Sequence, residues 1–230
     1  MSEESRKKMR QRQLERRRRQ RRRRRIKVAV ERLALFILLA VAILFMTSAL
    51  LKVRRWENLQ ALSLPDWCQE AYLPVNPYSR PGTERTKVKN IVVHYVANPG
   101  TTARENRNYF AGMADAPESE RRSVSSHFII GLEGEILCCV PVQEVAYANY
   151  PRNEDTISIE CCHPDNSGKF TQETQKSLVK LVSWLCGSLD LKASDVIRHY
   201  DVSGKNCPKY YVEHEDAWTT LKSEIADQIR

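Results

Sequence analysis

A run of nineteen residues without a charged side chain, Leu33–Leu51, is the feature that most constrains what this chain can fold into. A helix of that length rises about 28 Å, close to the thickness of a bilayer's hydrocarbon core. Basic residues are far more numerous before the run than after it, so the positive-inside rule places residues 1–32 in the cytoplasm. The sequence therefore predicts one transmembrane helix over residues 33–51, in a single-pass membrane protein whose remaining residues lie outside the cytoplasm.

A cleaved signal peptide is the alternative interpretation of the same run. Thr47-Ser-Ala49 offers small residues of the kind found at a cleavage site. The basic region before the run is much longer than in ordinary signals, however, and the run exceeds the usual apolar core of about 7–15 residues. Length therefore favours an uncleaved anchor.

The net charge of +9 is distributed unevenly along the chain. Residues 1–32 hold 16 Lys and Arg against 4 Glu, a net of +12, which leaves 21 against 24 acidic residues, a net of −3, for residues 33–230. Clusters such as Arg16–Arg19 and Arg21–Arg25 can neutralise nucleic-acid phosphates. No aromatic residue accompanies them for base stacking, so we expect attraction to anionic lipid headgroups instead of nucleic-acid binding.

The residues after the apolar run predict a short stalk followed by one domain. Residues 52–63 are polar and are assigned to the stalk, and residues 64–230 to the domain. The first part of the domain, residues 64–86, is rich in proline but also contains Trp67 and Tyr72, which favours an extended arm lying on the domain surface. An apolar content of 42% is enough for a packed core.

Strand and helix patterns alternate through this domain. The β-branched run Ile91–Val93 is typical of a buried strand, and a hairpin is predicted where Glu133-Gly-Glu135 joins two apolar segments. Thr171 can cap a helix with apolar residues at helical spacing. Further expected elements are strands at 128–132, 136–140, 156–162 and 196–197, and helices at 106–113, 171–187 and 213–229. The predicted fold class is α/β, a mixed central β-sheet flanked by helices, preceded by the transmembrane helix.

Two imidazoles and one thiol are candidate metal ligands. His94 follows the Ile91–Val93 strand, and His199 and Cys207 lie in the segment from Arg198 to Pro208. Two His and one Cys can hold zinc in an open tetrahedral site whose fourth position serves catalysis. Each residue also has a structural explanation: a hydrogen-bonded core histidine, or a cysteine acting as a small apolar side chain.

Four separated segments resemble the type 2 N-acetylmuramoyl-L-alanine amidases, the zinc family that includes the peptidoglycan recognition proteins. They are Asn90–Gly100, Val124–Gly131, Ile157–Glu160 and His199–Pro208, and the resemblance covers about residues 64–230. It implies Zn²⁺ as cofactor, bacterial peptidoglycan as substrate, and Glu160 as the catalytic glutamate. Some members carry a catalytic Tyr before the His of the second segment, where this chain has Ser126.

Two further residues are assigned catalytic roles. Glu160 ends an apolar strand, where a carboxylate requires a partner, a cleft or a metal, and a general base that later protonates the departing amine fits that position. Lys205 precedes Cys207 by two residues and could stabilise an oxyanion. The structural alternatives are a salt bridge at the sheet rim and an ordinary surface lysine. His127 and His163 are expected to be structural, with His163 a weaker candidate for substrate contact.

The sequence thus predicts a membrane-anchored zinc hydrolase, and the resemblance implies that it cleaves the amide bond between N-acetylmuramic acid and the L-alanine of the stem peptide. Two other classes remain as alternatives. One is a peptidoglycan-binding module without catalysis, and the other is a cysteine hydrolase with Cys207 as nucleophile and His199 as base. The six other cysteines do not define a disulfide pairing, and the sequence does not determine the oligomeric state.

Overall fold

The computed structural model describes residues 3–229, without the side chains of residues 5–8 and 11. Residues 1–2 of the predicted basic tail and residue 230 of the predicted domain lie outside the described residues. The chain divides into two compact units, Met1–Lys52 and Val53–Arg230, and each is described by itself.

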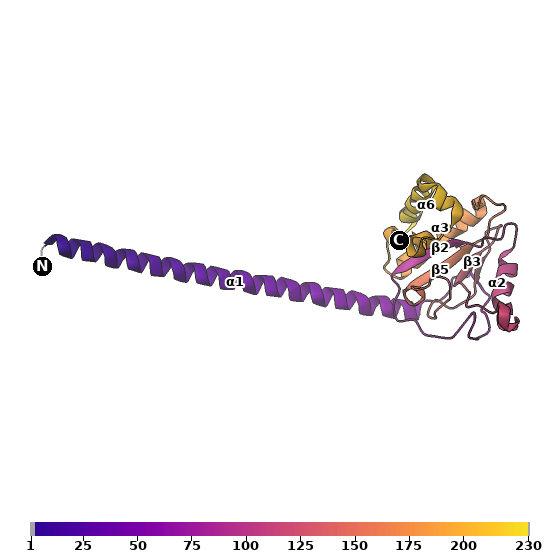
Figure 1. Ribbon diagram of the computed structural model, residues 1–230, viewed down its shortest axis with the longest axis horizontal. Helices are drawn as coiled ribbons and strands as arrows, with labels where there is room; N and C mark the ends of the chain where they lie inside the picture. Colours follow the sequence, from indigo (N-terminus) through magenta and orange to yellow (C-terminus); the bar gives the residue numbers. More distant parts are fainter. Residues whose placement is uncertain (1–2, 230) are drawn as a thin grey trace. The chain divides into compact units, whose positions relative to one another are not determined.

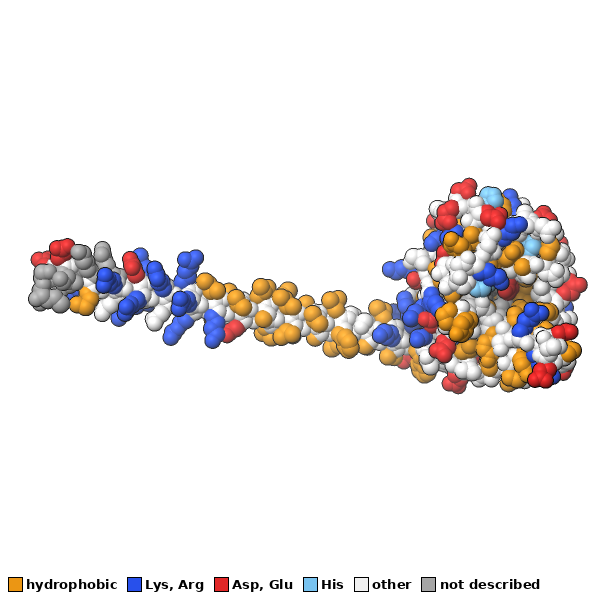
Figure 2. All heavy atoms as spheres, viewed as in Figure 1, with side chains coloured by type: hydrophobic (Ala, Val, Ile, Leu, Met, Phe, Trp, Pro, Cys, Tyr) orange, Lys and Arg blue, Asp and Glu red, His pale blue; other side chains and the backbone are white. Residues whose placement is uncertain are grey.

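The first unit belongs to one helix, α1 (Glu3–Ala61), which continues into the second unit. Along its described residues, a band of Lys and Arg is followed by an apolar band whose side chains are exposed (Figure 2). In the described part of the chain, one helical segment, Arg12–Ala61, is long and apolar enough to cross a membrane. Only length and composition support a membrane span here. A signal sequence would pass the same test.

A six-stranded mixed sheet organises the second unit, in the order β1-β4-β3-β5-β2-β6. Four neighbouring pairs, β1 with β4, β3 with β5, β5 with β2, and β2 with β6, are parallel, whereas β3 and β4 form the predicted antiparallel hairpin. The strands are β1 (Gln69–Glu70), β2 (Asn90–Tyr95), β3 (Phe128–Ile130), β4 (Ile136–Cys138), β5 (Thr156–Cys161) and β6 (Val196–Arg198).

Helices cover both faces of this sheet (Figure 1). Helix α3 (Gln172–Ser188) packs with α6 (Glu215–Gln228) on one face, and α2 (Ala103–Gly112) contacts β3 and β4 from the other. Two short helices, α4 (His199–Ser203) and α5 (Lys209–Glu213), follow β6. Short 3-10 turns lie at Glu118–Glu120, Asn153–Asp155 and Ala193–Asp195. The predicted mixed α/β architecture is therefore confirmed.

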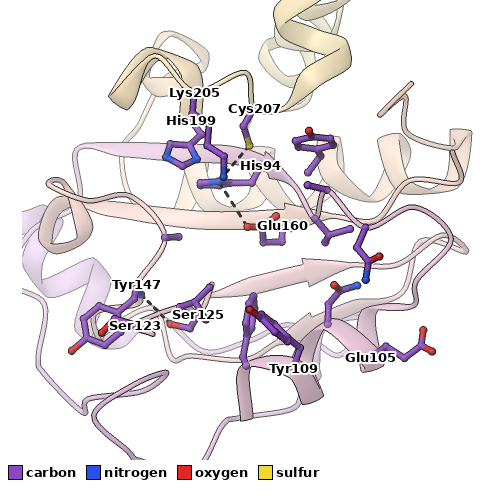
Figure 3. Close-up of a pocket in the computed structure, with 18 residues that line it drawn as sticks. His94, Glu105, Tyr109, Ser123, Ser125, Tyr147, Glu160, His199, Lys205 and Cys207 are labelled. Carbon is purple, nitrogen blue, oxygen red and sulfur yellow. Dashed lines mark hydrogen bonds and ion pairs between the residues drawn. The ribbon is translucent and has the colours of Figure 1, made fainter. Parts of the chain in front are cut away.

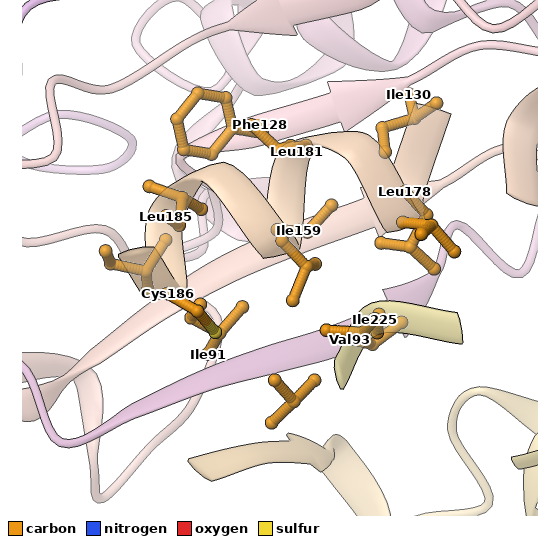
Figure 4. Packing of buried hydrophobic residues seen from close by; sticks show 14 of the residues in the cluster. Ile91, Val93, Phe128, Ile130, Ile159, Leu178, Leu181, Leu185, Cys186 and Ile225 are labelled. Carbon is orange, nitrogen blue, oxygen red and sulfur yellow. The ribbon is translucent and has the colours of Figure 1, made fainter. Parts of the chain in front are cut away.

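Alternation along the central strands assigns side chains to the two faces. Ile91 and Val93 of β2 are completely buried against α3 and α6 (Figure 4), together with Ile159 of β5. Successive residues of a strand point to opposite faces. Val92, His94 and Glu160 consequently lie on the other face, the one that α2 covers, so the site residues project away from the larger core.

Two segments differ in detail from the expected elements. The predicted helix over 213–229 is confirmed as α6 (Glu215–Gln228), but the short helix α5 (Lys209–Glu213) that precedes it was not predicted. Residues 53–61, which fall within the predicted stalk, form the last turns of α1, and Leu59 is 1% exposed in the domain core. Apolar burial at Leu59 explains why these turns belong to the second unit. The expected arm contributes β1, which pairs in parallel with β4.

Candidate metal centre

Parallel pairing of the central strands brings three chemically active residues to one edge of the sheet. His94 of β2 is the register partner of Glu160 in β5, and Val93 is paired with Arg198 of β6. His199 is the first residue of α4, immediately after β6 ends. Since the carboxyl ends of parallel strands meet at the same edge, residues more than a hundred positions apart in sequence become neighbours.

The loop after α4 brings Cys207 to the same edge. Gly204 ends α4 with φ of +75°, a left-handed conformation that glycine adopts without the penalty of a side chain. The amide of Tyr200 then donates to the carbonyl of Cys207 at 2.8 Å, which holds the loop closed. The Cys207 side chain is 1% exposed as a result.

The three predicted ligands form one cluster. Donor atoms of His94, His199 and Cys207 all lie within 4.8 Å of one another. The Cys207 Sγ is 3.7 Å from the His94 Nδ1, and the two imidazole centroids are 4.5 Å apart. Figure 3 shows the two rings and the sulfur converging at the end of the strands. The structure thus brings together the three residues that the sequence pattern selected.

Asn149 orients His94, and the sequence analysis missed it. The Thr156 hydroxyl donates to the Arg152 carbonyl at 2.6 Å, so it accepts from the Asn149 amide nitrogen at 2.8 Å. The Asn149 Oδ1 therefore faces His94 Nε2, 2.7 Å away, and that nitrogen must carry the proton. The lone pair of His94 consequently lies on Nδ1, the atom that faces Cys207 and the cluster. No local sequence signal marks this asparagine.

Other polar atoms in the cluster have no protein partner. The His199 Nδ1 is buried without a hydrogen bond, and so is the Glu160 Oε2. Buried polar atoms in proteins are almost always hydrogen-bonded, so unpaired ones indicate a site for an ion, a water or a ligand. His94 and His199 thus each have one imidazole nitrogen that is available to an ion or a ligand.

Burial dominates the protonation of the cluster. It lowers the pKa of His94 to about 3, with His199 contributing in the same direction, and it also lowers the pKa of His199. Burial raises the pKa of the Cys207 thiol to about 12, with the Glu160 carboxylate adding to the effect. Both imidazoles are therefore neutral at pH 7, the state in which they can bind a metal.

Glu160 and Lys205 complete the charged groups of the site. The Glu160 Oε1 is 3.8 Å from the His94 Nδ1, and 17% of this carboxylate side chain is exposed. Burial raises the pKa of Glu160 to about 8, and Lys205 opposes this shift. Lys205 is exposed at the cavity wall, and its charge also lowers the pKa of His199.

A cavity of about 490 Å³ extends from the cluster toward α2. The predicted ligands with Glu160 and Lys205 form one end, and residues of α2 such as Glu105 and Tyr109 line the other. Ser126 lies outside this lining and donates to the Phe128 carbonyl at 2.7 Å. The cavity is large enough for a segment of a polymeric substrate.

His127 and His163 are buried but do not belong to the ligand cluster, and His214 is exposed between α5 and α6. His127 is completely buried, where its Nδ1 bonds Ser158 and its Nε2 contacts Arg85. The His163 ring lies against Tyr95 in a tilted arrangement, with ring centroids 5.1 Å apart, and its Nε2 is buried and unpaired. Neither lines the cavity. All seven cysteines, which lie within the described residues, are buried and free, so the structure contains no disulfide in that range.

The sheet topology and the His-His-Cys cluster define an α/β protein with a candidate metal centre at the carboxyl edge of its parallel strands. Residues 84–210, more than half of the chain, match the N-acetylmuramoyl-L-alanine amidase family. The chain belongs to this family of peptidoglycan amidases.

Individual relatives agree with this assignment. The chain is 32% identical over 166 residues to the N-acetylmuramoyl-L-alanine amidase CwlL of Bacillus licheniformis, and 30% identical over 176 residues to BlyA of Bacillus subtilis (strain 168). Both alignments cover 67% of this chain, but it spans less than half of the relatives, 45% and 46%.

Solved structures share the fold. A mutant endolysin from Bacillus subtilis superposes with a TM-score of 0.56 at 25% identity, covering 69% of this chain and 97% of that one. The catalytic domain of XlyA gives a TM-score of 0.57 at 24% identity, covering 69% and 98%. The second unit accordingly has the amidase fold.

Proposed function

We propose that the chain is a zinc-dependent N-acetylmuramoyl-L-alanine amidase. Its substrate is peptidoglycan, and the bond cut is the amide between the lactyl group of N-acetylmuramic acid and the L-alanine of the stem peptide. The observation that carries this proposal is the convergence of His94, His199 and Cys207 within 4.8 Å at the end of a cavity. Relatives named N-acetylmuramoyl-L-alanine amidases support the reaction.

The donor set fits zinc. Hydrogen bonding by Asn149 leaves the His94 Nδ1 free to donate its lone pair, and the His199 Nδ1 has no protein partner. Two imidazole nitrogens and one thiolate make three protein ligands, the number typical of a catalytic zinc site. A zinc ion held by these residues would act as a Lewis acid that polarises the amide carbonyl and acidifies a water molecule.

Glu160 is the candidate general base. Its carboxylate lies beside the His94 ring at 3.8 Å, and its second oxygen is buried without a partner and therefore available to a water molecule or substrate. A general base must lie within hydrogen-bond reach of the proton that it removes. In this position Glu160 can take a proton from the attacking water and deliver it to the departing L-alanine amine.

Lys205 is placed to stabilise negative charge. It lines the same end of the cavity as Glu160 and His199, and its charge affects the pKa of both. A cation directed at the developing oxyanion interacts more strongly with the transition state than with the neutral amide. Lys205 can fill this role without being a ligand.

The alternatives explain fewer observations. A cysteine hydrolase would use Cys207 and one imidazole, and it would leave the second imidazole of the cluster without a role. A non-catalytic binding module requires neither the carboxylate of Glu160 beside the cluster nor the complete set of three donors. The zinc amidase uses all of these groups.

The deciding experiment uses the full chain in detergent with purified cell wall. Release of new L-alanine amino groups is expected, together with one zinc per chain, loss of activity in a strong chelator and recovery on adding zinc. Cys207→Asp should keep measurable activity, because carboxylate replaces thiolate as a zinc ligand, whereas Cys207→Ala should lose metal and activity together. Wild-type activity that survives exhaustive chelation, combined with an inactive Cys207→Asp, would refute the zinc assignment.

We also propose that Leu33–Leu51 is an uncleaved, single-pass anchor in a bacterial cell membrane. The basic tail, residues 1–32, would lie in the cytoplasm, and the amidase domain, residues 64–230, would act outside it after the short connection 52–63. The exposed apolar band of α1 and the excess of Arg before it support this arrangement.

Protease added to intact, wall-stripped cells tests this topology. The C-terminal domain should be removed while the N-terminal tail stays protected. Protection of the domain in intact cells, with digestion after lysis, would contradict the arrangement.

A further inference from the structure

The second unit carries a group of aromatic and basic side chains outside the lining of the cavity. Trp67 and Trp184 meet edge to face with ring centroids 5.8 Å apart, and the Lys180 ammonium lies 4.3 Å from the centre of the Trp67 ring. A separate surface hollow of about 540 Å³ adjoins these residues and reaches Gly187 and Ser188 at the end of α3. Both tryptophans are partly exposed, although a fully buried tryptophan side chain would contribute more to the stability of the fold.

The chain enters the second unit beside this hollow. Arg55 donates to the Asp190 carbonyl at 2.7 Å, and Arg54 lies 3.3 Å from the Asp190 carboxylate. Asp190 follows Ser188, the last residue of α3, by two positions. Arg54 itself is three residues beyond Leu51, the end of the uncharged run. The segment that directly follows α3 therefore contacts residues that follow the uncharged run by three and four positions in the sequence.

Strand polarity places the cavity at the opposite end of the unit. Helix α3 connects the parallel strands β5 and β6, so it runs back along the sheet and ends at the amino edge of the strands. Asn90, the first residue of β2, bonds the Asp195 carbonyl at 2.9 Å at this edge. His94 lies further along β2 by four residues, about 13 Å at roughly 3.3 Å per residue.

We propose that the face formed by Trp67, Lys180 and Trp184 rests on the outer surface of the bilayer that holds the anchor, so that the catalytic cavity lies on the side away from the membrane. This inference depends on the membrane anchoring proposed above. Tryptophan is enriched at the level of lipid headgroups because its ring is apolar and its N–H is polar. The Lys180 ammonium beside the Trp67 ring complements anionic headgroups.

In this orientation the cavity of the enzyme has a fixed direction relative to the membrane. A cavity at the carboxyl edge of the strands, with the membrane at the amino edge, faces the cell wall and not the lipid. The face also limits tumbling about the short connection, because aromatic and basic contacts hold the domain at its base. The orientation is inferred from contacts and strand polarity within the second unit and from the position of Leu33–Leu51 in the sequence.

Depth-dependent fluorescence quenching tests the proposal with the full chain. The protein is reconstituted into phosphatidylglycerol-containing vesicles, with or without lipids brominated near the headgroup. Trp56→Phe serves as the parent, because Trp56 follows the anchor closely and would be quenched wherever the domain lies. Quenching is expected in this parent and should disappear when Trp67→Phe and Trp184→Phe are added, leaving Trp218, which is 3% exposed.

A matched control moves the reporter to the cavity side. Tyr109→Trp in the variant without Trp67 and Trp184 places an exposed indole on α2, and no quenching is expected there. Replacing phosphatidylglycerol by phosphatidylcholine, or adding Lys180→Gln, should weaken the quenching of the parent because the cationic contact is lost.

The outcomes separate the two proposals. Flotation of the protein with vesicles tests the anchor, and a chain that stays in the soluble fraction would remove the basis of the orientation as well. A chain that floats but shows equal quenching in the parent and the double-Phe variant, or stronger quenching at Tyr109→Trp, would overturn the orientation and leave the anchor intact.

Discussion

Removing the acceptor that orients His94 should weaken the proposed zinc binding without changing a proposed ligand. In Asn149→Ala the His94 Nε2–H loses its 2.7 Å acceptor inside a site where His94 is 2% exposed. An unsatisfied buried donor costs about 1–3 kcal/mol. The two imidazole tautomers then compete, and the lone pair on Nδ1 is no longer enforced. Loss of such an outer partner typically lowers metal affinity by about 10- to 100-fold, or about 1.4–2.7 kcal/mol.

Zinc affinity is measured on the full chain by competition with a fluorescent chelator at pH 7.5. Asn149→Asp supplies a matched variant, because a carboxylate at this position still accepts from His94 and makes the ring a stronger ligand. We expect Asn149→Ala to bind zinc about 10- to 100-fold more weakly than the wild type, and Asn149→Asp to stay close to it.

Ser183→Ala is the control for general destabilisation. The buried Ser183 hydroxyl of α3 donates to the Ile225 carbonyl at 3.1 Å and has no hydrogen bond to the residues around Asn149. Its loss should lower the unfolding midpoint without changing zinc affinity. Wild-type zinc affinity in Asn149→Ala would refute the argument that this amide sets the His94 tautomer, and an equal loss in Ser183→Ala would attribute the effect to fold stability.

Four further outcomes are expected. Glu160→Gln should retain zinc while turnover falls by about two to four orders of magnitude, since the general base is removed; near-normal turnover would reduce Glu160 to a structural residue. Lys205→Gln should lower kcat by about 10²- to 10³-fold with zinc content unchanged, and a change in KM alone would contradict its role at the oxyanion. Leu181→Ala, at a completely buried site, should lower the free energy of unfolding by about 2–5 kcal/mol in urea titrations, whereas a loss within error would place it outside the packed core. Burial, followed by the charge of Arg85, lowers the pKa of His127 well below 6.5 and keeps the ring neutral. The contribution of this group to the free energy of unfolding should therefore be fully present above pH 6.5 and fall by up to about 1.4 kcal/mol per pH unit below it. The decline should be shallower in His127→Gln, and an unchanged slope would exclude this residue as a cause.

Several elements could be predicted because their signals are local. The Glu133-Gly134-Glu135 turn joins the predicted hairpin, and Gly134 has the positive φ of +84° that this turn requires. Thr171 caps α3 by accepting from the Thr174 amide. Capping, turn chemistry and apolar periodicity depend on residues within a few positions of one another, so a single sequence contains them.

The last helix was predicted within two residues of the bounds of α6, but α5 was not predicted, because five residues are too few to show a helical apolar period. The helical structure and burial of residues 53–61 were also not predicted. Their polar composition indicates a stalk, but burial of Leu59 and the contacts of Arg55 with Asp190 depend on a partner surface that is distant in sequence.

For the candidate site, the residue types and the family motifs selected His94, His199 and Cys207 from sequence alone, because metal chemistry restricts which side chains can serve. Tertiary structure decided the rest. Register pairing of β2 with β5 sets Glu160 beside His94, and the loop carrying Asn149 supplies the acceptor that fixes the tautomer. Strand polarity determines that the cavity and the end of α3 lie at opposite edges of the sheet. These relations depend on distances between segments far apart in the chain, which pairing and packing determine and local sequence does not encode.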